Sequence, residues 1–278
     1  MARPKVHMFT STPGEMDTNS FLIETERSIV AVDTQFLATP ARQVRAIIDA
    51  IGKPLVGVII SHSHPDHFNG TQILTEGFGD VPIMATQAVA DGMRGCADRI
   101  REKWLPMYGS DYPAETIYPN RIVEGGHVLS VDGADIVIDS LGPGEAPDLC
   151  VVWVPGSGDM IAGDLIYDGV HAWVVEQRSQ EWIDQLEDVK RRYVDARCFY
   201  SGHGGTGSTR LLDDQVAYIE RFRDFVHEGA RDGTIDQKQK SAIIVCIKQH
   251  FAGFKQDWWV PINVDAMANE LGLLVLPE

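Results

Sequence analysis

The sequence predicts an α/β protein in which short strands alternate with amphipathic helices. Two stretches, residues 19–33 and 121–139, have the pattern of β-meanders, with short apolar runs separated by turn residues. Between and after them, apolar residues recur every three to four positions, which is typical of helices packed on a sheet. With 278 residues the chain is long enough for one large domain or two average ones, with a sizeable core.

The first elements follow one another with short turns. Residues 19–24 and 28–33 are two apolar strands joined by a polar turn. Thr39 is expected to cap a helix that has a proline at its first position and ends at Gly52. The run at residues 55–60 is apolar and largely β-branched, so we expect a strand buried on both faces.

The most informative stretch begins where that strand ends and reads Ile-Ser-His-Ser-His-Pro-Asp-His. His62 and His64 are two positions apart, so in an extended chain their imidazoles point to the same side. Asp66 and His67 follow a proline that breaks the strand, so they can be aimed at a second point nearby. Three imidazoles and a carboxylate within six residues are the donors that a pair of borderline metal ions requires.

A His-x-His-x-Asp-His motif after a buried strand resembles the signature of the metallo-β-lactamase superfamily. The resemblance extends over roughly residues 5–226 and implies an α/β (α+β) fold, a four-layer αβ/βα sandwich of two mixed β-sheets. The metal ions would sit at one edge of that sandwich. We therefore expect a catalytic domain over residues 1–230 and a C-terminal helical extension over residues 231–278, packed on the core or on a partner subunit.

Several other motifs resemble elements of this family. Asp33, in an Asp-Thr pair, would hold a ligand histidine, or would only turn the chain at the end of a strand. Asp164, in a Gly-Asp pair, resembles the aspartate that bridges the two metals. His203, in a Gly-His element, would complete the second metal site, and glycines on both sides let the backbone approach closely.

The chain departs from the family at the third histidine of the first metal site. Family members place that histidine in the loop that corresponds to residues 141–149, where this chain has none. Counting back from the following strand puts Glu145 at the position. Three alternatives follow: Glu145 replaces the histidine, Asp148 does so, or the first site is degraded. We favour Glu145, because carboxylates bind zinc, iron and manganese well, so the replacement changes metal preference without preventing binding.

The resemblance implies a metallo-hydrolase with two divalent metal ions, with zinc favoured and iron or manganese as alternatives. The implied ligands are His62, His64 and Glu145 for the first ion, Asp66, His67 and His203 for the second, and Asp164 as the bridge. Two such ions lower the pKa of a shared water, which then attacks a carbonyl group. As catalytic groups we expect Asp164, through both metals, and Asp66, which also takes part in proton transfer.

The expected substrate is a small-molecule ester, lactone, amide or thioester. One rival function is a non-hydrolytic di-iron or manganese redox enzyme, and the other is a non-catalytic binding protein with a partly filled site. The aromatic segment from Trp104 to Tyr118 either forms a substrate wall or packs as an ordinary loop-rich segment. His171, on a predicted loop, either contacts substrate or has a surface or structural role.

Composition limits the partners. The formal net charge of −16, from 40 acidic and 24 basic residues, argues against nucleic acid, whose protein partners usually carry a basic patch. No apolar run approaches the ~18 residues of a membrane span, and no apolar region follows the basic start, so we expect neither membrane insertion nor a secretory signal. The four scattered cysteines fit reduced thiols in a cytoplasmic protein. The sequence leaves open whether the protein forms a homo-oligomer.

Overall fold

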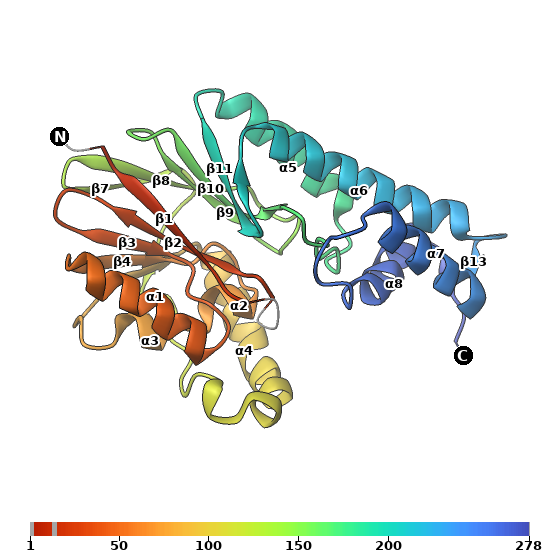
Figure 1. Cartoon of the computed structure of the whole chain (residues 1–278), viewed down its shortest axis with the longest axis horizontal. Coiled ribbons are helices and arrows are strands. Elements are labelled where there is room, and N and C mark those ends of the chain that lie inside the picture. Colours follow the sequence, from red (N-terminus) through yellow and green to blue (C-terminus); the bar gives the residue numbers. More distant parts are fainter. Residues whose placement is uncertain (1–2, 13–15, 278) are drawn as a thin grey trace.

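The computed structural model describes residues 3–12 and 16–277. Within this part of the chain, two six-stranded β-sheets lie face to face, and helices cover the outer surface of each (Figure 1). This arrangement confirms the predicted four-layer sandwich of two mixed sheets. None of the helices in the described residues combines the length and the apolar composition needed to cross a bilayer.

The first sheet is antiparallel over its first three strands and parallel over the rest. In spatial order its strands are β1 (Lys5–Thr10), β2 (Asn19–Glu24), β3 (Ile29–Val32), β4 (Leu55–Ile59), β5 (Ile83–Ala85) and β6 (Arg121–Ile122). Its outer face is covered by helices α1 (Ala38–Ile51), α3 (Thr71–Thr75) and α4 (Gln87–Tyr108), whose apolar sides share one buried cluster with the strands. The short helix α2 (Pro65–Phe68) follows β4 and carries the end of the histidine motif.

The second sheet is mostly antiparallel, with one parallel pair near its edge. In spatial order its strands are β12 (Thr206–Gly207), β11 (Cys198–His203), β10 (Asp159–Tyr167), β9 (Cys150–Val154), β8 (Ala134–Ser140) and β7 (His127–Val131). The parallel pair is β10 and β11, connected through helix α5 (Ser179–Arg192). Helices α5 and α6 (Arg210–Gly229) pack their apolar sides on this sheet.

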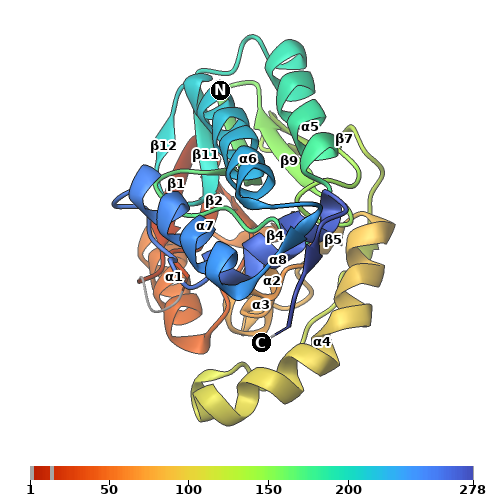
Figure 2. The same ribbon diagram turned by 90° about the vertical axis from the view of Figure 1, so that its right-hand side faces the viewer.

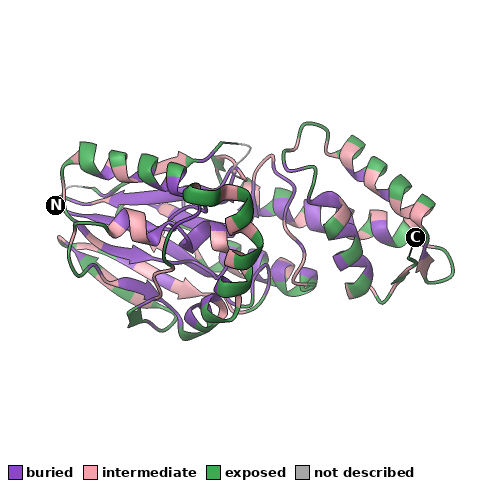
Figure 3. Cartoon of the chain, turned by 90° about the horizontal axis from the view of Figure 1, so that it is seen from below, coloured by how far each residue is buried: buried purple, intermediate pink, exposed green. Residues whose placement is uncertain are grey.

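A buried apolar layer joins the two sheets. Phe21, Val30 and Val32 of the first sheet share it with Ile138, Val152 and other residues of the second. In Figure 3 the buried residues run through the interior between the sheets, with exposed residues on the outer helix faces. Alternate residues of each strand can therefore pack inward while their neighbours pack against helices.

Helix α1 shows where a local prediction was wrong. Its N-terminal capping residue is Leu37, which makes no capping hydrogen bond, and Thr39 lies inside the first turn. The backbone N–H and the hydroxyl of Thr39 instead donate to Asp111, which belongs to the loop after α4. The other end agrees with the prediction, because Gly52 adopts a left-handed conformation (φ 72°) and its N–H donates to the carbonyl of Ile48.

Residues after α6 form β13 (Thr234–Ile235), α7 (Gln237–His250), α8 (Val260–Glu270) and β14 (Leu274–Val275). Two helices make up most of this segment, and β13 and β14 add a short parallel pair that was not expected. Asp236 begins α7 with a capping box in which it and Gln239 satisfy each other's backbone N–H groups. Apolar residues of α7 and α8 join the cluster of α5 and α6 on the second sheet, so in this chain the segment packs on the core (Figure 2).

Candidate metal centre

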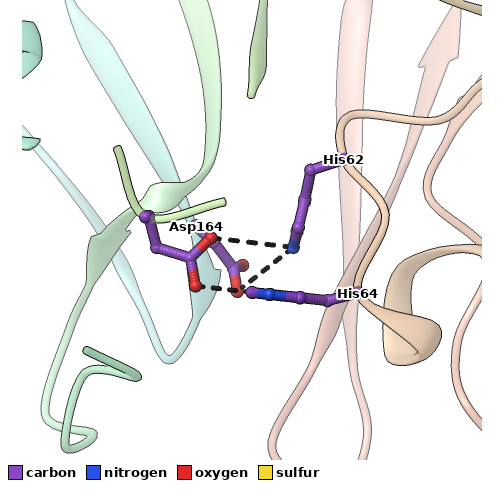
Figure 4. Close-up of side chains that lie close together, drawn as sticks. His62, His64 and Asp164 are labelled. Carbon is purple, nitrogen blue, oxygen red and sulfur yellow. Dashed lines mark ion pairs between the residues drawn. The ribbon is translucent and has the colours of Figure 1, made fainter. Parts of the chain in front are cut away.

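The predicted ligands meet at one edge of the sandwich, and they come from both sheets. His62 and His64 follow β4 of the first sheet, and Asp164 lies on β10 of the second. Figure 4 shows the two imidazoles facing the carboxylate across the gap between the sheets. His203 ends β11, beside β10, and Glu145 lies in the loop between β8 and β9.

His62, His64, Glu145 and Asp164 form a first group, with one donor atom of each lying within 4.8 Å of the others. His64 Nδ1 lies 3.3 Å from Glu145 Oε1. His62 Nε2 lies 3.6 Å from Asp164 Oδ2 and 3.9 Å from Glu145 Oε2. All except His64 are buried, so these donors converge inside the protein.

Asp66, His67 and His203 form a second group within the same 4.8 Å limit. Asp66 Oδ2 lies 3.4 Å from His67 Nε2 and 3.3 Å from His203 Nε2. The rings of His67 and His203 have centroids 5.5 Å apart although the residues are far apart in the sequence. This close approach confirms the predicted convergence of the motifs.

Asp164 lies between the two groups. Its Oδ1 is 3.2 Å from His67 Nε2, and its Oδ2 is 3.3 Å from His203 Nε2 and 3.6 Å from His62 Nε2. A single carboxylate thus contacts imidazoles of both groups, which is the placement expected of a bridging ligand.

Neighbouring polar groups fix the orientation of the histidines. Asp33 lies 2.8 Å from His67 Nδ1 and also accepts hydrogen bonds from the backbone N–H and hydroxyl of Ser61. His203 Nδ1 lies 2.8 Å from the carbonyl oxygen of Met16. A proton on each Nδ1 leaves Nε2 as the donor facing the centre. Of the two roles considered for Asp33, the geometry therefore supports the positioning of a ligand histidine.

Two contributors were missed by the sequence reasoning. The Tyr167 hydroxyl donates to Asp164 Oδ2 at 2.6 Å and lies 2.9 Å from Glu145 Oε1. The Thr18 hydroxyl donates to Asp66 Oδ2 at 2.9 Å. Tyr167 lies on the same strand as Asp164, but strict alternation three residues on would turn it to the other face. A register irregularity in β10 brings Tyr167 to the site. No sequence pattern predicted that irregularity.

A further carboxylate, also missed, lies on the outer side of His64. Glu176 Oε1 is 4.0 Å from His64 Nε2, and the Glu176 side chain is one third exposed. His64 therefore has Glu145 on its Nδ1 side and Glu176 on its Nε2 side. This arrangement presents Nδ1, rather than Nε2, to the first group.

Two other candidates lie outside both groups. Asp148 accepts hydrogen bonds from the hydroxyls of Thr86 and Ser140, which occupy both of its oxygens. Of the two carboxylates considered for the first site, the structure brings Glu145, and not Asp148, to the histidines. His171 is fully buried, with its Nδ1 3.0 Å from the hydroxyl of Tyr218. These surroundings favour the structural role over contact with a substrate.

The aromatic segment packs and also borders a cavity. Trp104, Tyr108 and Tyr112 each meet Phe36 in an edge-to-face arrangement, with centroids 5.6 to 6.0 Å apart. Trp104 and Tyr108 also line an open cavity of about 560 Å³, whose other side is formed by Met16 and residues 255–258. The contacts with Phe36 therefore support the packing alternative, and the substrate wall stays a prediction.

The charged groups of the centre shift one another's pKa values. Burial disfavours ionisation of Asp66 and Asp164, but the neighbouring histidines outweigh it and hold the pKa of each carboxyl well below its usual range. Burial alone would lower the pKa of His203, yet Asp164 and Asp66 raise it to about 10. Burial raises the pKa of Glu145. The carboxylates thus create an environment that strongly favours positive charge.

Buried polar atoms without a hydrogen-bond partner indicate whether the residues of the centre suit metal ions. His62 Nε2, His67 Nε2, Glu145 Oε2 and Asp164 Oδ1 are buried without a hydrogen-bond partner in the described structure. They nonetheless face one another, with 3.2 Å between His67 Nε2 and Asp164 Oδ1. Buried polar atoms are rarely left unpaired, and imidazole and carboxylate are donors suited to zinc, iron and manganese. The residues therefore fit a metal centre.

A model of the metallo-beta-lactamase superfamily matches residues 13–203, which is more than half of the chain. The chain belongs to the metallo-β-lactamase superfamily. A relative from Bacteroides fragilis, "Metallo-beta-lactamase type 2", is 22% identical over 213 residues, covering 75% of this chain and 78% of its own. The relative from Chryseobacterium indologenes, "Metallo-beta-lactamase IND-1", is 24% identical over 196 residues, covering 68% and 72%.

Solved structures show the same fold. The metallo-beta-lactamase from Pontibacter korlensis superposes with a TM-score of 0.62 at 16% identity, covering 79% of this chain and 96% of that one. About a fifth of this chain therefore has no counterpart in that structure. Membership of the superfamily, together with the donor groups, supports a metal-dependent hydrolase as the general class.

Proposed function

We propose that this superfamily member is a hydrolase that uses two divalent metal ions to cleave a small-molecule ester, lactone, amide or thioester. The observation that carries the proposal is the position of Asp164, whose two oxygens contact imidazoles of both donor groups. A carboxylate between two groups of donors offsets the repulsion between two cations. A site built for one ion would not need it.

The donor groups divide into two sites. His62, His64 and Glu145 would hold one ion, Asp66, His67 and His203 the other, and Asp164 would bridge them. Zinc is favoured by the imidazoles, while the extra carboxylate of Glu145 also suits iron or manganese. When bound, the ions supply Lewis acidity, which acidifies water and polarises a carbonyl group.

In the proposed reaction, Tyr167 and Asp66 hold or accept protons. Burial, together with Asp164 and Glu145, raises the pKa of Tyr167 well above its usual value, so its phenol stays protonated and its single O–H donates to one of the two carboxylates at a time. Asp66 stays ionised beside His67 and His203, and it is placed to accept a proton as water attacks the substrate.

Metal analysis followed by a substrate panel tests the proposal. The purified protein should hold two divalent ions per chain and should turn over at least one member of a panel of aryl esters, lactones, thioesters and β-lactams. Removing the ions with a chelator should abolish that turnover, and adding them back should restore it. Two ions per chain without turnover of any panel member would contradict hydrolysis, and iron with oxidase activity would establish the redox alternative.

A further inference from the structure

The turn formed by residues 16–18 contacts two of the proposed second-site ligands. The carbonyl oxygen of Met16 lies 2.8 Å from His203 Nδ1, and the hydroxyl of Thr18 donates to Asp66 Oδ2 at 2.9 Å. The backbone of Thr18 also pairs with that of His203 in an isolated antiparallel bridge. The position of this turn therefore sets the orientation of both ligands.

The turn needs support from elsewhere in the protein. Met16 and Asp17 have φ values of 72° and 56°, in the left-handed region that residues other than glycine rarely adopt. The side chain of Asp17 is 1% exposed, and a carboxylate in that position is costly unless other groups pair with it. The turn is thus a conformation that its surroundings must hold.

Ser11 and Gln35 hold the backbone of Thr18, and the support for Asp17 comes from a segment between α7 and α8. Lys255 Nζ lies 2.6 Å from Asp17 Oδ1, and Gln256 Nε2 donates to Asp17 Oδ2 at 2.9 Å. The backbone of Lys255 is fixed in turn, since its N–H donates to Gly169 and its carbonyl accepts from His171 at 3.0 Å. Gly169 and His171 belong to the loop that follows β10, the strand that carries Asp164. The segment therefore connects the turn to the second sheet.

We propose that Lys255 and Gln256 are positioning residues for the second metal site. By holding Asp17, they fix the turn whose carbonyl and hydroxyl groups orient His203 and Asp66. Both residues lie beyond residue 203, where the match to the superfamily ends. The C-terminal segment would then be part of the metal-binding apparatus of this chain, and this inference rests on the ligand roles proposed above.

Loss of the two side chains should affect one site selectively. Without them, Asp17 would be left buried and unpaired, and the turn would relax away from His203. His62 and Glu145, of the first site, depend on other partners, the hydroxyls of Ser61 and Tyr167. The second ion should therefore bind more weakly while the first is retained.

The test is a titration of metal-free protein with Zn²⁺ in competition with a chromophoric chelator. In the double variant Lys255→Met/Gln256→Leu, one Zn²⁺ equivalent should bind tenfold or more less tightly than in the parent, in line with the ~10–100-fold effects of groups that orient metal ligands. The other equivalent should keep its affinity. The single variant Lys255→Arg, which retains Gln256, should bind both equivalents nearly as tightly as the parent, because arginine keeps a cation that can reach Asp17.

Lys240→Met is the matched control. It breaks an ion pair with Asp265, also in the C-terminal segment, and should leave both affinities unchanged. If the double variant does not fold, Lys255→Met alone and Asp17→Asn give the same comparison. Parent affinities in these variants, or an equal weakening of both equivalents, would overturn the proposal.

Failure of the proposal for Lys255 and Gln256 can be distinguished from failure of the proposed function. A parent protein that binds two ions without hydrolysing any substrate would contradict hydrolysis but would leave the titration decisive for Lys255 and Gln256. A parent protein that binds fewer than two ions would overturn both proposals.

Discussion

Glu145 brings a carboxylate to the first donor group, at the position where the resemblance to the superfamily leads us to expect a histidine. The substitution adds a negative charge to a centre that already contains Asp66 and Asp164, and Tyr167 donates a hydrogen bond toward the added oxygen. A carboxylate beside a bound cation makes a coordinated water less acidic than a neutral imidazole would. We therefore expect metal preference and the acidity of bound water in this chain to depend on Glu145.

Three substitutions of Glu145 test this role. Glu145→Ala should weaken the first site roughly tenfold or more while the second, with His67 and His203, keeps its ion. Glu145→Gln keeps the size and one oxygen but loses the charge, so its occupancy should fall toward that of the alanine variant. Glu145→His should restore binding and shift preference toward zinc. Metal content by mass spectrometry checks all three, and two ions in every variant would make Glu145 an ordinary loop residue.

Asp164→Ala should be more damaging than any single histidine substitution. In the proposed centre its carboxylate would serve both sites, so its loss would leave two cations without a shared counter-charge. We expect kcat/KM to fall on the order of a hundredfold or more, which corresponds to about 3 kcal/mol of transition-state stabilisation. Steady-state kinetics and metal content measured on the same samples check this. Near-normal turnover with two ions per chain would remove Asp164 from the centre.

At the scale of elements, the parallel pair β10 and β11 places the second sheet's ligands. A Cβ atom at Gly202 would lie 1.8 Å from Asp164 Oδ1 and 2.7 Å from its backbone nitrogen, so only glycine allows β11 to approach this closely. The same irregular pairing sets Tyr167 against His203, with the two rings stacked 4.9 Å apart. The local geometry of two strands thus decides which side chains face the candidate metal centre.

A buried histidine in the loop after β10 should make the free energy of unfolding depend on pH. His171 is buried there, and burial lowers its pKa to about 4, although Asp257 partly opposes the shift. In the unfolded chain the pKa would be about 6.5, so between these values the unfolded state binds more protons. The contribution of neutral His171 is therefore complete above about pH 6.5 and falls as the pH drops toward 4, by at most about 3 kcal/mol.

Urea unfolding of metal-free parent and His171→Gln proteins between pH 4.5 and 7.5 measures this contribution. Glutamine keeps a neutral polar side chain but cannot take up the proton. The free energy of unfolding of the parent should therefore decline more steeply with acidification than that of the variant. Parallel curves would show that His171 does not titrate in this range.

At the scale of the whole molecule, the centre connects the two sheets. His62 and His64 extend from the first, and Asp164 and His203 from the second, so bound ions would join them at their shared edge. Ions that bind the folded chain much more tightly than the unfolded chain stabilise the fold through mass action. Metal binding should therefore influence the stability of the entire sandwich.

Metal removal should lower the melting temperature. At ion concentrations about a thousandfold above the dissociation constant, one bound ion contributes about 4 kcal/mol. For a domain of this size that corresponds to a decrease on the order of 10 °C after chelation. Differential scanning calorimetry before chelation, after it, and after adding Zn²⁺ back checks the effect. Identical melting temperatures in all three samples would rule out a centre that joins the sheets.

The sequence by itself determined the fold class and half of the centre. His62, His64, Asp66 and His67 lie within six residues, so a strand and the break after it suffice to bring them together. Superfamily resemblance added Asp164 and His203, and the end of helix α1 at Gly52 was predicted correctly. These features depend on local periodicity and turn chemistry, which short stretches of sequence express directly.

Only the tertiary structure decided which distant groups complete the centre. The sequence left Glu145 and Asp148 as alternatives, and the structure separated them because Thr86 and Ser140 bind Asp148 elsewhere. Tyr167 reaches the site through an irregular strand pairing, and Lys255 reaches Asp17 across 238 positions of sequence. Such contacts are set by strand register and by packing between segments far apart in the chain, and no local pattern encodes either one.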